Sequence, residues 1–154
     1  MIAVAGLMVG LGVGAGTARA IPEYSQPNLV TTLRCDSPNP WPGPKLRVRV
    51  DVFNQIAFPA DGLPGPAISL IGSIRGKPEL VEYTSDVRVS WKNQRTGRTG
   101  TVAVPTRART VTWQVDLHPG AGPVTFTIRQ KIGALFVVPM LNPQYSTCRG
   151  AATA

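Results

Sequence analysis

Few side chains in this sequence could carry out acid–base chemistry. The single histidine, His118, stands in the turn sequence Leu-His-Pro-Gly, and the chain has no serine in a G-x-S-x-G context. Among the eight acidic residues, Glu79, Glu82 and Asp86 are close enough in sequence to meet, as the two carboxylates of a glycosidase must. We interpret them as solvated charges at strand ends. The sequence therefore predicts no enzyme, and a small secreted hydrolase with loop carboxylates is the alternative.

Metal and cofactor chemistry is not predicted either. With one histidine in the chain, the ligands for a structural zinc site are lacking, and no D-x-[DN]-x-[DN]-G run could form a calcium loop. We therefore assign no catalytic, cofactor-binding or metal-ligating residue from the sequence.

Cys35 and Cys148 are the two cysteines, and they bracket most of the chain. An even number of cysteines in an oxidising compartment favours a disulfide bond. In the chain-entropy model, closing so long a loop stabilises the folded state by up to about 4.7 kcal/mol. Two free buried thiols are the alternative.

The N-terminus is typical of an export signal. An uncharged, glycine-rich apolar run is followed by small residues at Ala18 and Ala20, as at a signal-peptidase site. The run is shorter than the roughly 20 apolar residues of a membrane span. We expect a signal peptide over 1–20 and a single secreted domain over 21–154, without a stable membrane span, in the extracellular space or cell envelope. An uncleaved N-terminal anchor is the alternative.

Apolar and polar residues alternate with a period of two in several segments, as in strands with one buried face. The clearest segment alternates Leu46, Val48 and Val50 with Arg47 and Arg49. We predict clear strands at 46–52, 87–92, 111–116 and 124–129, and weaker ones at 28–33, 67–74, 101–104 and 135–138. Seven or eight short strands separated by Pro/Gly-rich turns predict an all-β protein, a two-sheet β-sandwich, with a small β-barrel as the alternative.

Residues 115–128 run Val-Asp-Leu-His-Pro-Gly-Ala-Gly-Pro-Val-Thr-Phe-Thr-Ile. This stretch resembles the corner between strands E and F of immunoglobulin-like and fibronectin type III-like sandwiches, where the chain crosses from one sheet to the other. The resemblance implies an immunoglobulin-like β-sandwich whose first and last strands, here 28–33 and 135–138, run parallel and bring Cys35 near Cys148. The composition also resembles that of small secreted actinobacterial proteins.

The basic residues are the main candidates for partner binding. The formal net charge is +8, and the positive side chains are dispersed without a Lys/Arg block or a nucleic-acid-binding motif, so we expect no nucleic acid partner. The strand phase places Arg47, Arg49 and Arg88 on outward faces, while Arg95 and Arg98 fall in a hairpin loop. Whether these arginines form one patch depends on strand order, which the sequence does not give.

Two aromatic residues on loops complete the candidate binding residues. Trp41 is flanked by prolines, and Phe58 lies in an apolar loop, whereas Trp91 and Trp113 alternate in phase with core valines. We expect a non-catalytic binding protein whose partner is an anionic envelope polymer, a lipid or another protein. A structural subunit of an envelope assembly, with residues 135–141 covered by another chain, is a further alternative.

Overall fold

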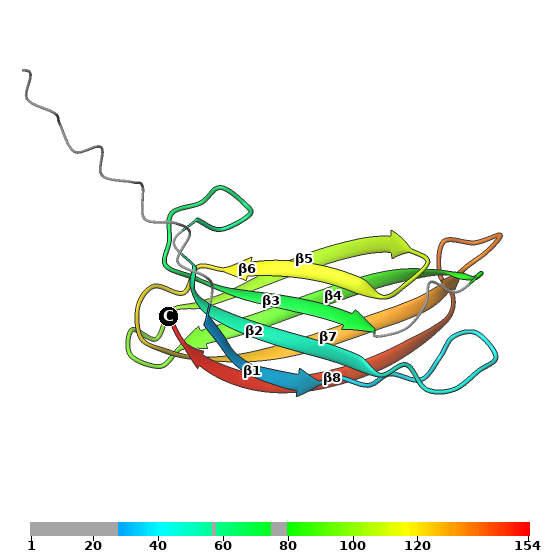
Figure 1. Ribbon diagram of the computed structural model, residues 1–154, viewed down its shortest axis with the longest axis horizontal. Helices are drawn as coiled ribbons and strands as arrows, with labels where there is room; N and C mark the ends of the chain where they lie inside the picture. The colour runs from blue at the N-terminus through cyan, green and yellow to red at the C-terminus, as the bar shows by residue number, and fades with distance from the viewer. Residues whose placement is uncertain (1–27, 57, 75–79) are drawn as a thin grey trace, which may run out of the picture.

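The structure, a computed structural model, describes residues 28–56, 58–74 and 80–154, and Figure 1 shows its strands. The expected signal peptide, its cleavage site after Ala20, and Glu79 lie outside these residues. The strands are β1 (Asn28–Arg34), β2 (Val48–Ile56), β3 (Ala67–Ile74), β4 (Glu82–Asn93), β5 (Thr99–Ala108), β6 (Thr112–Leu117), β7 (Pro123–Leu135) and β8 (Leu141–Thr153).

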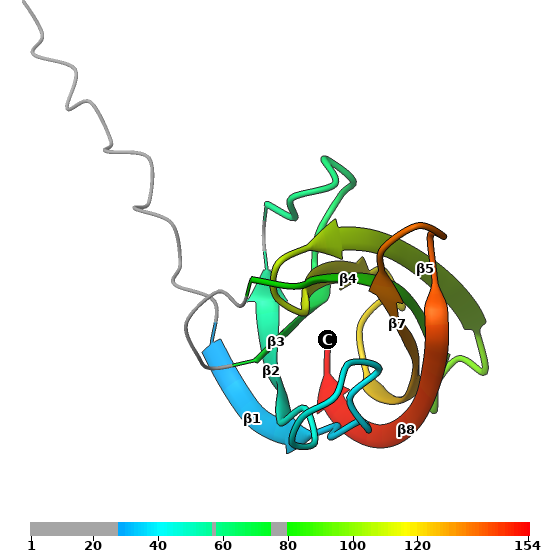
Figure 2. The same cartoon turned by 90° about the vertical axis from the view of Figure 1, so that its right-hand side faces the viewer.

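The eight strands form two four-stranded sheets, in the orders β1-β2-β3-β6 and β5-β4-β7-β8. All neighbouring strands within each sheet pair antiparallel. Figure 2 looks along the sandwich from the end that carries the β1–β2 and β7–β8 loops. The two-sheet β-sandwich is thus confirmed, and the sheets are not closed into a barrel. No helix in the described part of the chain is long and apolar enough to cross a membrane.

The period of two explains which residues face the core. Val48, Val50 and Val52 of β2 are fully buried, whereas Arg49 and Asp51 between them are only half-buried. The same alternation buries Val87 and Val89 of β4 and leaves Arg88 exposed. The predicted alternation is therefore confirmed in these two strands.

The hairpin between β4 and β5 also follows the prediction. Gly97 has a φ of 73°, a backbone conformation that residues with a side chain rarely adopt. Its N–H donates a hydrogen bond to the carbonyl oxygen of Asn93 at 2.9 Å. Trp91 is half-buried and packs across the ladder over Gly100, where a Cβ atom would overlap the indole ring. Trp113, by contrast, is fully enclosed in the core.

A buried glutamine joins the two sheets in the middle of the core. Gln130 of β7 accepts a hydrogen bond at Oε1 from the Trp113 indole nitrogen of β6, at 3.2 Å. Its Nε2 donates to the Cys35 carbonyl oxygen at 2.9 Å and to the Ser146 hydroxyl at 3.3 Å. Because buried polar groups cost free energy unless they are paired, this network fixes how β6 and β7 face each other.

The prediction of a last strand at 135–138 is wrong. β7 ends at Leu135, residues 136–140 form a turn, and Phe136 and Val137 are 71% and 83% exposed. The last strand is β8, which pairs with β7 along nearly its whole length. An apolar run without alternation does not distinguish a buried strand from an exposed loop. The sequence of β8 shows no alternation of apolar and polar residues, because its inward positions include Ser146 and Gly150 instead of large apolar residues.

The disulfide bond between Cys35 and Cys148 is confirmed, with the two Cα atoms 5.4 Å apart. Its setting differs from the expectation. Cys148 lies in the middle of β8 opposite Ile128, and Cys35 follows β1, which belongs to the other sheet. The arrows of β1 and β8 point in opposite directions in Figure 1, so the expected parallel arrangement is wrong. The bond therefore joins the edges of the two sheets.

Candidate functional site

The outer face of the β5-β4-β7-β8 sheet gathers positive charge. Arg88 in β4 lies directly opposite Arg129 in β7, in the centre of the sheet. Their neighbours Val87, Val89 and Ile128 are fully buried, so the alternation of strands turns both arginines outward. Both side chains are exposed to solvent.

Strand pairing adds four more cations to this face. Lys92 is four residues beyond Arg88 in β4, and Arg107 in β5 lies opposite Thr84. Lys131 in β7 lies opposite Tyr145, and Arg149 in β8 opposite Thr127. The cationic face thus consists of Arg88, Lys92, Arg107, Arg129, Lys131 and Arg149, and the same side of β4 carries two carboxylates, Asp86 and Glu82.

The electrostatics of the cationic face favour an anion. Like charges directly opposite each other in a sheet are destabilising. Arg88 has a carboxylate nearby, with 3.9 Å between its Nη2 and the Oδ2 of Asp86. Among the described residues, Lys92, Arg129 and Arg149 form no ion pair. Arginine can hold phosphate, sulfate or carboxylate groups with two parallel hydrogen bonds, so the face has free donors for anions.

Arg47 and Arg49 are not part of the cationic face. Arg49 lies in β2, in the other sheet, and Arg47 immediately precedes that strand, so both lie on the side of the sandwich away from Arg88. The Nη2 atom of Arg49 is 3.4 Å from Oδ1 of Asp51, which also accepts a hydrogen bond from the Thr32 hydroxyl at 2.6 Å. Arg49 lies directly opposite Arg34 of β1, so this side of the sandwich carries a smaller group of three arginines, Arg34, Arg47 and Arg49, with the Asp51 carboxylate among them.

Arg95 and Arg98 lie in the β4–β5 hairpin, at the end of the sandwich next to Lys92. The Nη2 atom of Arg95 donates to the carbonyl oxygen of Ala121 at 2.6 Å, so this arginine ties its hairpin to the β6–β7 loop. Arg98 is exposed in the same turn. The two arginines border the cationic face and do not belong to its centre.

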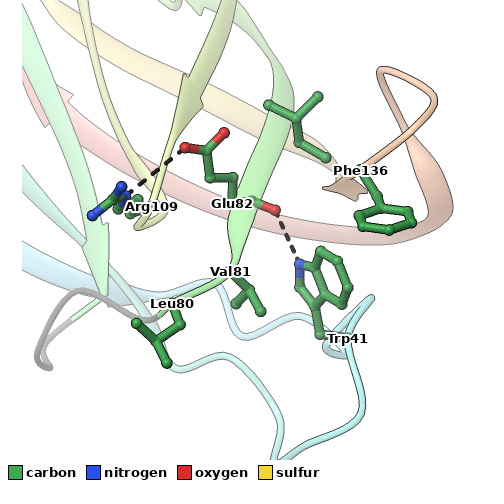
Figure 3. A pocket seen from close by; sticks show the side chains of 7 residues that line it. Trp41, Leu80, Val81, Glu82, Arg109 and Phe136 are labelled. Carbon is green, nitrogen blue, oxygen red and sulfur yellow. Dashed lines mark hydrogen bonds and ion pairs between the residues drawn. The ribbon is translucent and has the colours of Figure 1, made fainter.

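Trp41 lies at the opposite end of the sandwich and lines a pocket of about 460 Å³ (Figure 3). Its indole nitrogen donates a hydrogen bond to the carbonyl oxygen of Glu82 at 3.0 Å. Its ring packs edge-on against the ring of Phe136, with 6.3 Å between the two ring centroids. The Nε atom of Arg109 is 3.8 Å from a Glu82 carboxylate oxygen. The lining residues are Trp41, Leu80, Val81, Glu82, Arg109, Leu135 and Phe136.

Apolar side chains are exposed around this pocket. Leu80 is fully exposed, Val138 and Leu141 are each 46% exposed, and Phe136 and Val137 are more exposed still. The apolar end of the sandwich is therefore defined by Trp41, Leu80, Phe136, Val137, Val138 and Leu141. Exposed apolar side chains gathered in this way are uncommon on the surface of a monomeric protein.

Phe58 is 73% exposed on the β2–β3 loop, at the end of the sandwich opposite Trp41. The structure does not bring these two aromatic residues together. The loop that carries Phe58 is held to β6 by a hydrogen bond from the Ala60 N–H to the Asp116 carboxylate, at 2.9 Å.

His118 and Asp61 form a pair that the sequence analysis missed. His118 Nε2 is 2.7 Å from Asp61 Oδ2, and its Nδ1 is 3.1 Å from the carbonyl oxygen of Pro64. With both ring nitrogens engaged, the imidazole has none left to activate a nucleophile. The hydrogen bond from the Leu63 backbone N–H is the main cause that lowers the pKa of Asp61, and the hydrogen bond with His118 lowers it further. No spacing in the sequence indicates a pair whose members come from two separate loops.

The carboxylates considered for hydrolysis have arginine neighbours. Glu82 lies near Arg109, and Asp86 lies near Arg88, at the distances given above. Both carboxylates are on the outward side of β4, and the Glu82 carboxylate borders the pocket of Figure 3. Glu79, the third of these residues, lies outside the described part of the chain.

Comparison with known proteins adds no family to this description. No protein-family model, no curated protein and no solved structure matches the chain. Two features of the described residues distinguish the surface: the cationic face on one sheet and the apolar end beside it.

Proposed function

We propose that the protein is a non-catalytic binding module that acts in the extracellular space or cell envelope and docks on an anionic partner through the cationic face. The observation that carries this proposal is the direct opposition of Arg88 and Arg129 at the centre of six cations. Two adjacent arginines weaken the sheet unless an anion lies between them.

The shape of the face suits an extended anion. Arg88 and Lys92 are four residues apart along β4, about 13 Å at the rise of a strand, and neighbouring strands are about 4.8 Å apart. A flat array of cations at such spacings can meet several charges of one polymer or one surface at once. The summed positive potential also speeds the encounter with a polyanion.

The disulfide bond supports the proposal that the protein is located outside the cytoplasm. Bonds such as Cys35–Cys148 persist in oxidising compartments and are rare where thiols are kept reduced. The expected signal peptide over 1–20 agrees with this location.

Binding to dextran sulfate, a soluble polyanion, tests the proposal. The face variant carries Arg88→Glu with Arg129→Glu. Its matched control carries Arg34→Glu with Arg47→Glu, two exposed arginines on the other side of the sandwich, one in β1 and one immediately before β2. Both variants change the net charge equally, so a difference between them reports position and not total charge.

We expect the native protein to bind at low salt, the face variant to bind at least about tenfold more weakly, and the control to change little. The affinity should fall as salt shortens the Debye length from about 10 Å at 0.1 M to about 3 Å at 1 M. Equal losses in both variants, or no binding at low salt, would contradict the proposal.

A further inference from the structure

The β7–β8 loop forms an apolar tip at one end of the sandwich. Phe136, Val137 and Val138 are consecutive and exposed, and the loop projects beyond the strands in Figure 1. Leu80 presents another exposed apolar side chain across the pocket. Single exposed apolar residues are normal on protein surfaces, but a contiguous group on a projecting loop is not.

Aromatic and cationic residues flank this apolar tip. The indole N–H of Trp41 donates a hydrogen bond to the carbonyl oxygen of Glu82, which leaves the apolar part of the ring for other contacts. Tyr145, farther along β8, is 67% exposed. Lys131 of the cationic face lies over the Tyr145 ring, 6.0 Å from its centroid. Aromatic rings beside cations are typical of the boundary between lipid and water, where each side chain has an apolar part and a polar part.

Further cations lie at the same end. Arg109 lines the pocket with Phe136, and its side chain is 68% exposed, while Lys45 on the β1–β2 loop is 62% exposed. Their ion pairs are long, at 3.8 Å to Glu82 and 3.9 Å to Asp36. Exposed pairs of this kind contribute little stability, so both cations can turn to other anions.

We infer that the apolar end inserts into the interfacial layer of an anionic lipid membrane, with Lys45, Arg109 and Lys131 against the head groups. This inference rests on the proposed function, because it identifies the anionic partner of the cationic face as a lipid surface. We choose an anionic lipid surface as the partner because the exposed side chains around the tip include these three cations. Buried apolar area and attraction to anionic lipids add together in interfacial binding.

Vesicle binding tests this inference separately from the proposed function. The tip variant carries Phe136→Ser with Val137→Ser. The control carries Phe58→Ser with Leu63→Ser, which removes two exposed apolar side chains at the opposite end of the sandwich. Each protein is measured on phosphatidylcholine vesicles with and without phosphatidylglycerol, and on dextran sulfate in solution.

We expect the native protein and the control to bind the anionic vesicles, and the tip variant to bind them about tenfold more weakly. All three proteins should bind dextran sulfate equally. Brominated lipids should quench the fluorescence of the native protein, and Trp41→Phe should abolish that quenching because Trp91 and Trp113 face the core.

The outcomes distinguish the two proposals. If the tip variant binds vesicles as well as the native protein and brominated lipids do not quench Trp41, the inference is wrong while the proposed function stands. If the face variant keeps full affinity for dextran sulfate, the proposed function fails instead. If the native protein is a dimer and the tip variant a monomer, another chain covers the apolar end, and the inference is likewise wrong.

Discussion

Arg88 and Arg129 face each other across the β4–β7 ladder, with their Cα atoms in direct register. Each flanks a fully buried core residue, Val87 or Ile128, so neither arginine can leave the outer face without breaking the alternation of its strand. The fold itself therefore holds two positive charges side by side.

Relieving this repulsion should stabilise the protein. Arg129→Glu replaces a like-charged pair by an opposite-charged one, and we expect the free energy of unfolding to rise by about 0.2–1 kcal/mol while affinity for polyanions falls. Urea denaturation at low salt measures the change. Lys92→Glu is the control, because its cross-strand neighbours are Thr99 and Thr125. An equal gain in both variants would mean that the Arg88–Arg129 repulsion is not its source.

The disulfide bond should contribute strongly to stability. Removing the bond with Cys35→Ala and Cys148→Ala should lower the free energy of unfolding by up to about 4.7 kcal/mol, because the unfolded chain regains the entropy of a long loop. Reduction of the native protein should give the same midpoint of unfolding, and reductant should not affect the double variant. A native midpoint that does not move on reduction would show that the bond adds no stability.

The buried network around Gln130 should be sensitive to loss of its polar group. Gln130→Leu leaves the Trp113 indole N–H and the Cys35 carbonyl oxygen without their partner. We expect a loss of about 1–3 kcal/mol in the free energy of unfolding. The matched change Gln114→Leu, at an exposed position of β6, should cost far less. Similar losses at the two sites would argue against a role for the network.

Asp61 should make the protein sensitive to acid. Its pKa is lowered in the folded state, first by the Leu63 N–H and then by His118, so its ionised form stabilises the fold. This contribution is present above the unfolded pKa of about 3.9 and is lost as the pH falls through the lower folded value. Asp61→Asn should therefore be less stable than the native protein at neutral pH, and the difference should vanish in acid. A difference that persists at low pH would contradict this assignment.

The sequence predicted the fold best where large apolar residues alternate with polar ones. Val48, Val50 and Val52 define β2 in this way, and the crossing between sheets at β6 and β7 is also as expected. β8 escaped detection because small and polar residues fill its inward positions, where Leu33 and Phe126 leave no space for a Cβ atom at Gly150. Export and the resemblance to immunoglobulin-like sandwiches stay predictions.

The candidate site could be predicted only in part. The alternation of residues predicted that Arg88 faces outward. That Arg129 lies next to it follows from the long-range pairing of β4 with β7, which no local pattern shows. Arg149 belongs to the site through β8, the strand that the sequence did not indicate. Trp41 and Phe136 meet although they are far apart in sequence, and no local pattern encodes such a contact.

Nuclear magnetic resonance can locate the bound anion on the surface of the protein. Amide and arginine Nε resonances of the isotopically labelled protein can be followed while a short sulfated oligosaccharide is added at low salt. We predict that the shifts concentrate on Arg88, Arg129 and Arg149 and on the amides of β4 and β7, and that they disappear at high salt. Shifts centred on Arg34 and Arg47 on the other side of the sandwich, or spread evenly over all arginines, would show that the anion does not bind the cationic face.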